Sequence, residues 1–214
     1  EVKLNRYATG SNKEEVAQNL GTIEMEKLME GDDWTGVWTI TVEGDLKNTY
    51  YTYSITNPTH IYYDEPGLAY VTHETQDVYS YAVGVNGDRS MVVDLSDTDP
   101  DGWDSDSHIY VDQQSDAIVW EVQVKDFSYN PNSGVSEANR GKYLAFTETG
   151  TTLDGEGNIA TGIDYLKSLG VTHVQINPFY DFATIDEDRN TTDDSEFNWG
   201  YDPKNYGVPE GSYS

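Results

Sequence analysis

The chain has 214 residues, with 39 Asp and Glu against 12 Lys and Arg, so its formal net charge at pH 7 is −27. A field of this sign repels phosphate backbones and anionic lipids, which argues against nucleic-acid binding and a membrane-surface role. No apolar run approaches the roughly 18 residues of a membrane-spanning helix, and the absence of cysteine excludes disulfides and thiolate metal sites. The 17 Tyr, 5 Trp and 5 Phe supply enough apolar surface for cores, so we expect a folded protein with an acidic surface.

Short β-strands are predicted near the start of the chain. Residues 22–28 and 37–42 alternate between apolar and polar side chains and flank an acidic turn at residues 30–33, which predicts a hairpin. Residues 49–55 are β-branched and aromatic and predict a third antiparallel strand. Residues 12–20 are short and polar, so we expect a surface turn or loop there. Strands this short and closely spaced favour a β-sandwich.

An acidic segment divides the chain. Residues 72–103 show weak periodicity and are expected to form a sandwich edge and connector, whereas residues 96–107 are rich in Asp and predict a solvated linker. We therefore place a first domain at residues 1–97, a linker at 98–115 and a second domain at 116–214. The chain does not begin with Met and ends in Gly-Ser-Tyr-Ser, so we expect it to be part of a longer polypeptide.

The second domain begins with a different pattern. Residues 116–124 are almost continuously apolar, as in a strand buried on both faces of a parallel sheet. Apolar residues three apart within 161–170, followed by Gly170, predict a helix, and residues 171–178 predict the next strand. Strand, helix and strand form one right-handed crossover unit, and two parallel strands alone do not complete a domain.

Two motifs in this region resemble known proteins. Gly-Val-Thr-His-Val-Gln-Ile-Asn-Pro at 170–178 resembles the second barrel strand of the α-amylase family of glycoside hydrolases, and residues 197–214 are similar to the signature of type I pullulanases. Stretches at 82–95, 116–128 and 141–144 agree with this family, whereas residues 1–33 match poorly. The chain departs from the family pattern at Ala145, Phe197, Gly207 and the strand end Asn177-Pro178-Phe179-Tyr180, where Leu-Pro-Val-Phe is more common.

The resemblance implies both a fold and an activity. The fold is an immunoglobulin-like, starch-binding-type β-sandwich, truncated at its start, followed by the opening strands and helix of a (β/α)8 barrel. The activity is retaining hydrolysis of α-1,6-glucosidic branches in pullulan, starch or glycogen. The family's Asp nucleophile and Glu acid/base would lie beyond residue 214, so no catalytic residue is assigned in this chain and the chain alone is expected to be inactive.

The signature also implies substrate contacts. Tyr201 corresponds to the aromatic platform that stacks against glucose at the cleavage site, and Asp202 follows it in the same loop; Trp199 and Tyr206 are weaker candidates. Loop aromatics of this kind also simply pack a loop onto a barrel rim. In the first domain, Trp34 and Trp38 are a candidate second glucan platform, although Trp38 within a strand is more typical of a core residue than of a binding surface.

The remaining expectations concern cofactors, partners and rival functions. The four His residues lack metal-ligand spacing, so no metal site is assigned, and two-carboxylate hydrolysis requires no cofactor; a structural calcium ion is left open. The expected partners are an α-glucan and the remainder of the barrel, in the same or a second chain. An extracellular or cell-surface bacterial location is favoured over the cytoplasm. Rival functions are a non-catalytic α-glucan-binding or assembly module and an α-1,4-acting enzyme.

Overall fold

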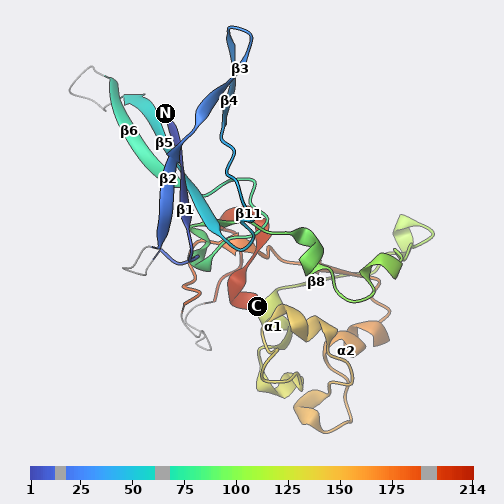
Figure 1. The fold of residues 1–214 in the computed structure, drawn as a ribbon. Coiled ribbons are helices and arrows are strands. Elements are labelled where there is room, and N and C mark those ends of the chain that lie inside the picture. Colours follow the sequence, from blue (N-terminus) through green and yellow to red (C-terminus); the bar gives the residue numbers. More distant parts are fainter. Residues whose placement is uncertain (13–17, 61–67, 189–196) are drawn as a thin grey trace. The chain divides into compact units, whose positions relative to one another are not determined.

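The computed structural model describes residues 1–12, 18–60, 68–188 and 197–214 and divides them into two compact units (Figure 1). The first unit comprises Glu1–Asp97 together with Asn205–Val208, and the second comprises Thr98–Lys204 together with Pro209–Ser214. In the part of the chain that is described, no helix is both long and apolar enough to cross a membrane.

The first unit is built on a five-stranded antiparallel sheet. Its strand order is β2-β1-β5-β6, and β7 pairs with the beginning of β5. The strands are β1 (Val2–Tyr7), β2 (Asn19–Glu24), β5 (Tyr50–His60), β6 (Leu68–Thr75) and β7 (Ser90–Met91). The strand predicted at 49–55 is thus confirmed as antiparallel, but β1 and β6, which flank it in the sheet, were not predicted. Within the predicted loop at 12–20, β2 already begins at Asn19, and residues 13–17 lie outside the described residues.

The predicted hairpin exists with different boundaries. It consists of β3 (Glu26–Glu30) and β4 (Asp33–Thr39), a separate two-stranded ribbon (Figure 1). The strand predicted over 22–28 was wrong, because the chain leaves the large sheet at Met25, whose N–H donates to the carbonyl of Val2 at 3.0 Å, and then enters the hairpin. On this hairpin the rings of Trp34 and Trp38 meet edge to face, with their centroids 6.0 Å apart.

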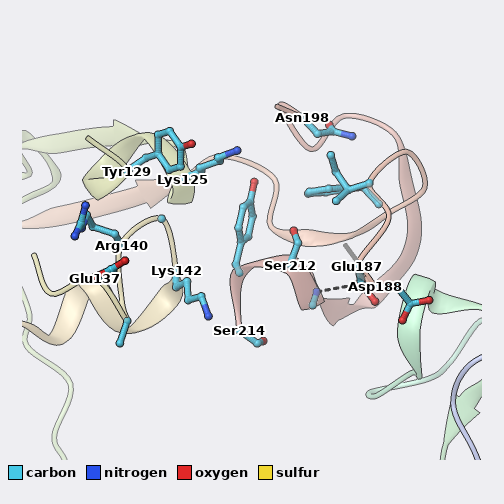
Figure 2. A pocket seen from close by; sticks show the side chains of 16 residues that line it. Lys125, Tyr129, Glu137, Arg140, Lys142, Glu187, Asp188, Asn198, Ser212 and Ser214 are labelled. Atoms are coloured by element: carbon cyan, nitrogen blue, oxygen red, sulfur yellow. Dashed lines mark hydrogen bonds between the residues drawn. The ribbon is translucent and has the colours of Figure 1, made fainter. Parts of the chain in front are cut away.

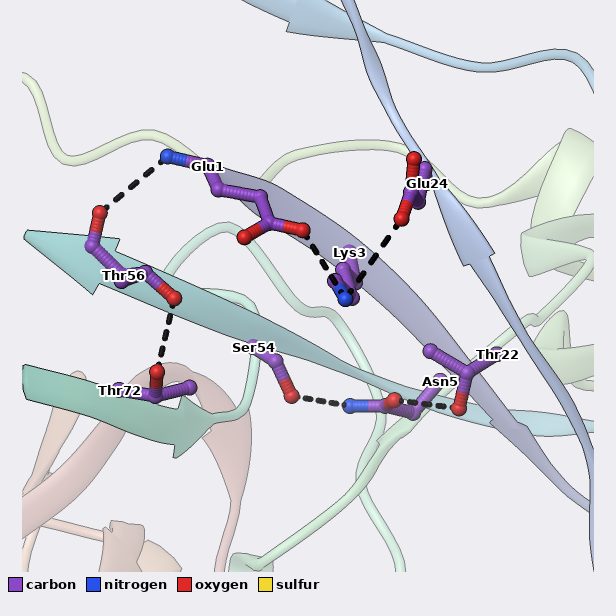
Figure 3. A network of polar contacts seen from close by, with 8 residues as sticks. All are labelled: Glu1, Lys3, Asn5, Thr22, Glu24, Ser54, Thr56 and Thr72. Atoms are coloured by element: carbon purple, nitrogen blue, oxygen red, sulfur yellow. Dashed lines mark hydrogen bonds and ion pairs between the residues drawn. The ribbon is translucent and has the colours of Figure 1, made fainter.

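One face of the large sheet carries a network of polar contacts that includes the buried side chain of Asn5 (Figure 3). Register places Asn5 opposite Thr52 on one side and Thr22 on the other. The Asn5 Nδ2 donates to Thr52 Oγ1 at 3.1 Å and to Ser54 Oγ at 2.8 Å, while its Oδ1 accepts from Thr22 Oγ1 at 2.9 Å. Asn5 and Thr52 are buried, so these bonds satisfy groups that water cannot reach. The network ties three strands together through side chains as well as backbone.

We predict that Asn5→Ala lowers the free energy of unfolding by about 1–3 kcal/mol, because it removes a buried amide together with its hydrogen bonds to Thr52, Ser54 and Thr22. Urea denaturation measures the change. Asn57→Ala, on an exposed position of the same sheet, is the matched control and is expected to cost less than about 0.5 kcal/mol. Equal costs for the two variants would contradict a structural role for the network.

The second unit contains the predicted strand, helix and strand. The parallel strands β8 (Val119–Val122) and β9 (His173–Ile176) pair directly, and α2 (Gly162–Ser168) lies between them in the sequence. The first predicted strand was too long, because α1 (Val124–Ser128) begins within it: the Gln123 side chain accepts the N–H of Asp126 at 2.8 Å and caps the helix. Val119 is 55% exposed rather than buried, since no third strand joins this pair within the described ranges.

The rest of the second unit is largely irregular. Val124, Phe182, Ile185 and Tyr213 form a buried hydrophobic cluster in it. Strand β10 (Tyr180–Phe182) pairs with β11 (Pro203–Pro209). The described 3-10 helices of the whole chain are η1 (Val85–Gly87), η2 (Leu95–Thr98), η3 (Trp103–Ser105), η4 (Gln114–Asp116), η5 (Pro131–Ser133), η6 (Tyr143–Thr147), η7 (Leu153–Gly155) and η9 (Gly211–Tyr213).

Candidate functional site

The loop at residues 198–202 is closed by its own polar side chains. The Asn198 Nδ2 donates to Asp202 Oδ1 at 2.9 Å and to Thr184 Oγ1 at 2.6 Å, while its Oδ1 accepts the N–H of Gly200 at 2.7 Å. The other carboxylate oxygen of Asp202 accepts from Thr184 Oγ1 at 2.7 Å. Asp202, which the sequence suggested for substrate contact, therefore holds the loop in shape. Asn198 and Thr184, its partners, were not identified from the sequence.

Gly200 brings this loop onto the end of β9. Its φ is +86°, and a Cβ at this position would lie 2.1 Å from the carbonyl oxygen of Pro178. No L side chain fits in that space, and the positive φ is itself unfavourable for residues other than glycine. The residue that follows, Tyr201, is thereby positioned beside the strand end.

Gln123 fixes the same loop from the end of β8. Its Nε2 donates to the carbonyl oxygen of Asn198 at 3.1 Å and to the hydroxyl of Tyr213 at 2.6 Å. The side chain is buried, and its Oε1 caps α1. One glutamine therefore joins the first parallel strand to the loop that carries Tyr201.

Tyr201 borders a cavity at the carboxyl ends of β8 and β9. Its side chain is 70% exposed, and the cavity has a volume of about 240 Å³. Ligand sites of α/β sheets and barrels lie at this end of the parallel strands. The other lining residues are Glu121, Gln175, Ile176, Asn177, Pro178, Phe179 and Tyr180.

The other candidate aromatics do not line this cavity. Trp199 is 56% exposed and packs edge to face against Phe197, with ring centroids 5.0 Å apart. Tyr206 is 69% exposed and lies on β11, in the segment Asn205–Val208 that groups with the first unit. Of the four predicted contact residues, the structure brings Tyr201 to the cavity and makes Asp202 its structural support.

A larger cavity in the second unit, of about 550 Å³, lies elsewhere (Figure 2). Its cationic lining residues are Lys125, Arg140 and Lys142, and its acidic ones are Glu137, Glu187 and Asp188. The Nζ of Lys125 lies 4.7 Å from the centroid of the Tyr129 ring. The lining thus carries both signs of charge, and none of the four predicted contact residues belongs to it.

Three carboxylates converge near this second cavity. Oxygens of Asp181, Glu187 and Glu210 lie within 4.8 Å of one another, and the first and last of these residues are buried. Burial raises the pKa of Glu210; hydrogen bonds from Ser212 and from the Phe182 N–H act against the shift, and the charge of Asp181 adds to it. Within the described residues this oxygen-donor set could hold a metal ion of the hard type.

We predict that Gly200→Ala destabilises the protein by about 3 kcal/mol or more, because its Cβ would overlap the Pro178 backbone as well as adopt a strained φ. Gly155→Ala is the matched control: its φ is +70°, but nothing lies within 4 Å of the added Cβ. The control substitution is therefore expected to lower the free energy of unfolding only through its strained backbone conformation, by about 1 kcal/mol. Chemical denaturation of both variants separates the two terms, and equal losses would contradict the close contact with Pro178.

Comparison with known proteins finds relatives over most of the chain. It is 37% identical over 194 residues to a pullulanase of Bacillus subtilis (strain 168), an alignment that covers 90% of this chain and 23% of that protein. No protein-family model matches the chain.

Solved structures match the entire chain. A pullulanase of Paenibacillus barengoltzii in complex with maltohexaose and α-cyclodextrin has a TM-score of 0.82 and 36% identity, covering 100% of this chain and 29% of that one. A pullulanase from Bacillus acidopullulyticus has a TM-score of 0.77 and 38% identity, covering 100% of this chain and 23% of that one. The chain spans about a quarter of the length of the relatives that it matches.

Proposed function

We propose a function from the family to which this chain belongs, the type I pullulanases. The chain is part of a glycoside hydrolase that cleaves α-1,6-glucosidic branch linkages in pullulan, starch or glycogen. The observation that carries this proposal is the position of Tyr201, held by Gly200 and Asn198 beside the cavity at the ends of β8 and β9.

A fixed, exposed tyrosine is suited to binding sugar. Its ring face offers apolar area to the C–H surface of a glucosyl unit while the hydroxyl stays in contact with water. The Paenibacillus barengoltzii relative was solved with maltohexaose and α-cyclodextrin, which supports an α-glucan as the ligand of this chain. In this proposal Tyr201 binds and orients the sugar, and Asn198 and Asp202 keep the loop in position.

The chemical step belongs to groups outside residues 1–214. Retaining hydrolysis uses two carboxylates about 5 Å apart, one as nucleophile and one as acid and then base. None of the acids in this chain matches a family motif for either role, so the chain alone is inactive in this proposal. The remainder of the catalytic barrel, in the same or a second chain, supplies the nucleophile and the acid/base.

The proposed domain organisation follows the same reasoning. Residues 1–97 form an immunoglobulin-like, starch-binding-type sandwich, residues 98–115 a linker, and residues 116–214 the opening of a (β/α)8 barrel. The large antiparallel sheet supports the first assignment, and the parallel pair β8 and β9 with α2 between them supports the last. We propose an extracellular or cell-surface bacterial location over a cytoplasmic one, with no nucleic-acid partner and no membrane insertion.

A non-catalytic α-glucan-binding module is the second candidate. The first unit contains a cavity of about 400 Å³ whose lining includes Trp38, Tyr50, Tyr51 and Tyr53. Aromatic rings gathered around a cavity favour sugar binding by the first unit, with or without hydrolysis. Measuring glucan binding and pullulan hydrolysis on the same sample separates this candidate from the first.

We predict that Tyr201→Ala, in the full natural chain that carries these residues, lowers kcat/KM on pullulan by about tenfold or more, because at least ~1.4 kcal/mol of transition-state contact is lost. Tyr201→Phe keeps the ring and is expected to remain within about threefold of the unmodified enzyme. Steady-state kinetics of reducing-sugar release measure both. A change below twofold for Tyr201→Ala would remove the assignment of this residue.

We further predict that hydrolysis requires no cofactor and that any calcium ion has a structural role. EDTA is then expected to leave kcat on pullulan unchanged well below the melting temperature, because two carboxylates perform the chemistry. A calcium effect, where present, is expected in Tm, since an ion that binds only the folded state stabilises it. Loss of activity in EDTA at low temperature, restored by calcium, would contradict this prediction.

A further inference from the structure

Three exposed tyrosines of the first unit lie outside the cavities described above. Tyr79 and Tyr81 are 84% and 65% exposed and belong to the segment between β6 and β7, where Val78 is 77% exposed. Tyr206 on β11 is 69% exposed. None of these four residues lines any of the three cavities. Exposed apolar groups that lie together on a folded protein mark contact sites, so their arrangement matters.

The two segments that carry these tyrosines pack against each other. A Cβ on Gly207 would lie 2.6 Å from the carbonyl oxygen of Ser80, the residue between the first two tyrosines. Asn205 is buried, and its Nδ2 donates to the carbonyl oxygen of Gly87 at 3.0 Å. This part of β11 belongs to the first unit. Tyr206, between these two contacts in the sequence, is therefore held next to the turn that carries the other tyrosines.

Hydrogen bonds fix the backbone of that turn. The carbonyl oxygen of Asp77 accepts the N–H of Ser80 at 3.1 Å, and its Oδ1 accepts the N–H of Tyr79 at 2.9 Å. The Asp77 N–H donates to the Oγ of Ser90, a buried residue, at 2.7 Å. The hydroxyl of Tyr51 donates to Asp77 Oδ2 at 2.9 Å. Aromatic side chains on a backbone that is already ordered can bind a ligand at a smaller entropic cost.

The chemistry of this surface suits a neutral ligand. Residues 78–87 carry no charged side chain, although the chain as a whole has 39 acids. A basic protein partner would be attracted to carboxylates and an anionic ligand to cations, and this segment offers neither. A tyrosine ring presents apolar area to the C–H face of a sugar while its hydroxyl stays in water. A neutral polysaccharide is therefore the class of ligand that the surface fits.

We propose that Val78, Tyr79, Tyr81 and Tyr206 form a second α-glucan-binding surface, which belongs to the first unit and shares no residue with the cavity beside Tyr201. This inference rests on the proposed function, because it takes an α-glucan as the ligand. The surface holds the polysaccharide through its aromatic rings and takes no part in breaking the glucosidic bond.

Calorimetric titration with maltohexaose tests the proposal in the full natural chain. All variants carry Tyr201→Ala as well, so that the ring beside the cavity does not contribute to the measured affinity. We expect Tyr79→Ala to raise Kd about fivefold or more and the double variant Tyr79→Ala/Tyr81→Ala about 20-fold or more, because each loses an aromatic contact. Tyr79→Phe keeps the ring and is expected to stay within about twofold. Tm is expected to stay unchanged, since these side chains are exposed.

Tyr70→Ala is the matched control. Tyr70 is 72% exposed on β6 of the same unit, and the strand continues from it to Thr75, roughly 17 Å further along at the usual rise per residue. The control is expected to change neither Kd nor Tm. An equal rise in Kd for Tyr70→Ala and Tyr79→Ala would overturn the proposal, because the effect would not belong to this surface.

A protein occupant of the surface would give a different result. If another part of the full chain or a second copy covers these tyrosines, the double variant lowers Tm by several degrees or changes the molecular mass measured by light scattering, while Kd stays the same. Either outcome would overturn the proposal. Tyr81→Ala alone provides the second variant if the double variant does not fold.

The outcomes also separate this inference from the function on which it rests. Pullulan hydrolysis by the unmodified protein, together with an unchanged Kd for Tyr79→Ala, would overturn only the second surface. If the unmodified protein does not hydrolyse pullulan, a Kd that rises with Tyr79→Ala and not with Tyr70→Ala still supports the surface in a glucan-binding protein. Absence of maltohexaose binding in the Tyr201→Ala protein would overturn the surface in either case.

Discussion

The contact between the backbone of Gly200 and the carbonyl oxygen of Pro178 determines where the candidate site can form. A Cβ on Gly200 would lie 2.1 Å from that oxygen, so the loop reaches the end of β9 only because glycine has none. Gln123 secures the other side of the loop from the end of β8. The side chain of Tyr201 is exposed, and the Asn198 side chain in the same loop bonds to Asp202 and to the Gly200 backbone.

The parts of the fold that could be predicted from the sequence are those whose pattern is local. Three such patterns are each complete within about ten residues: the apolar run before Val122, the helical spacing ahead of Gly170 and the strand at His173. Their order implied the parallel pair of strands. Strand β1 could not be predicted in the same way. It is stabilised by β5, about fifty residues later, and the Asn5 amide nitrogen donates to side chains of that strand.

The site was predicted unevenly for a related reason. Tyr201 and Asp202 were both predicted as substrate contacts from the same motif; in the structure Tyr201 borders the cavity, and Asp202 accepts hydrogen bonds that close the loop. Which of the two roles a polar loop residue has depends on partners such as Thr184, eighteen residues away.

The strong negative charge of the chain is compatible with a neutral sugar ligand and unfavourable for an anionic one. A neutral polysaccharide gains and loses nothing from a net charge of −27, whereas a phosphorylated or carboxylated ligand would have to overcome it. Affinity in such a protein must come from ring stacking and from neutral hydrogen bonds, both of which act at contact distance and are insensitive to salt. The lining of the cavity includes the aromatic ring of Tyr201 and the neutral polar residue Gln175. The acidic surface can then keep the protein soluble without affecting how this cavity recognises its ligand.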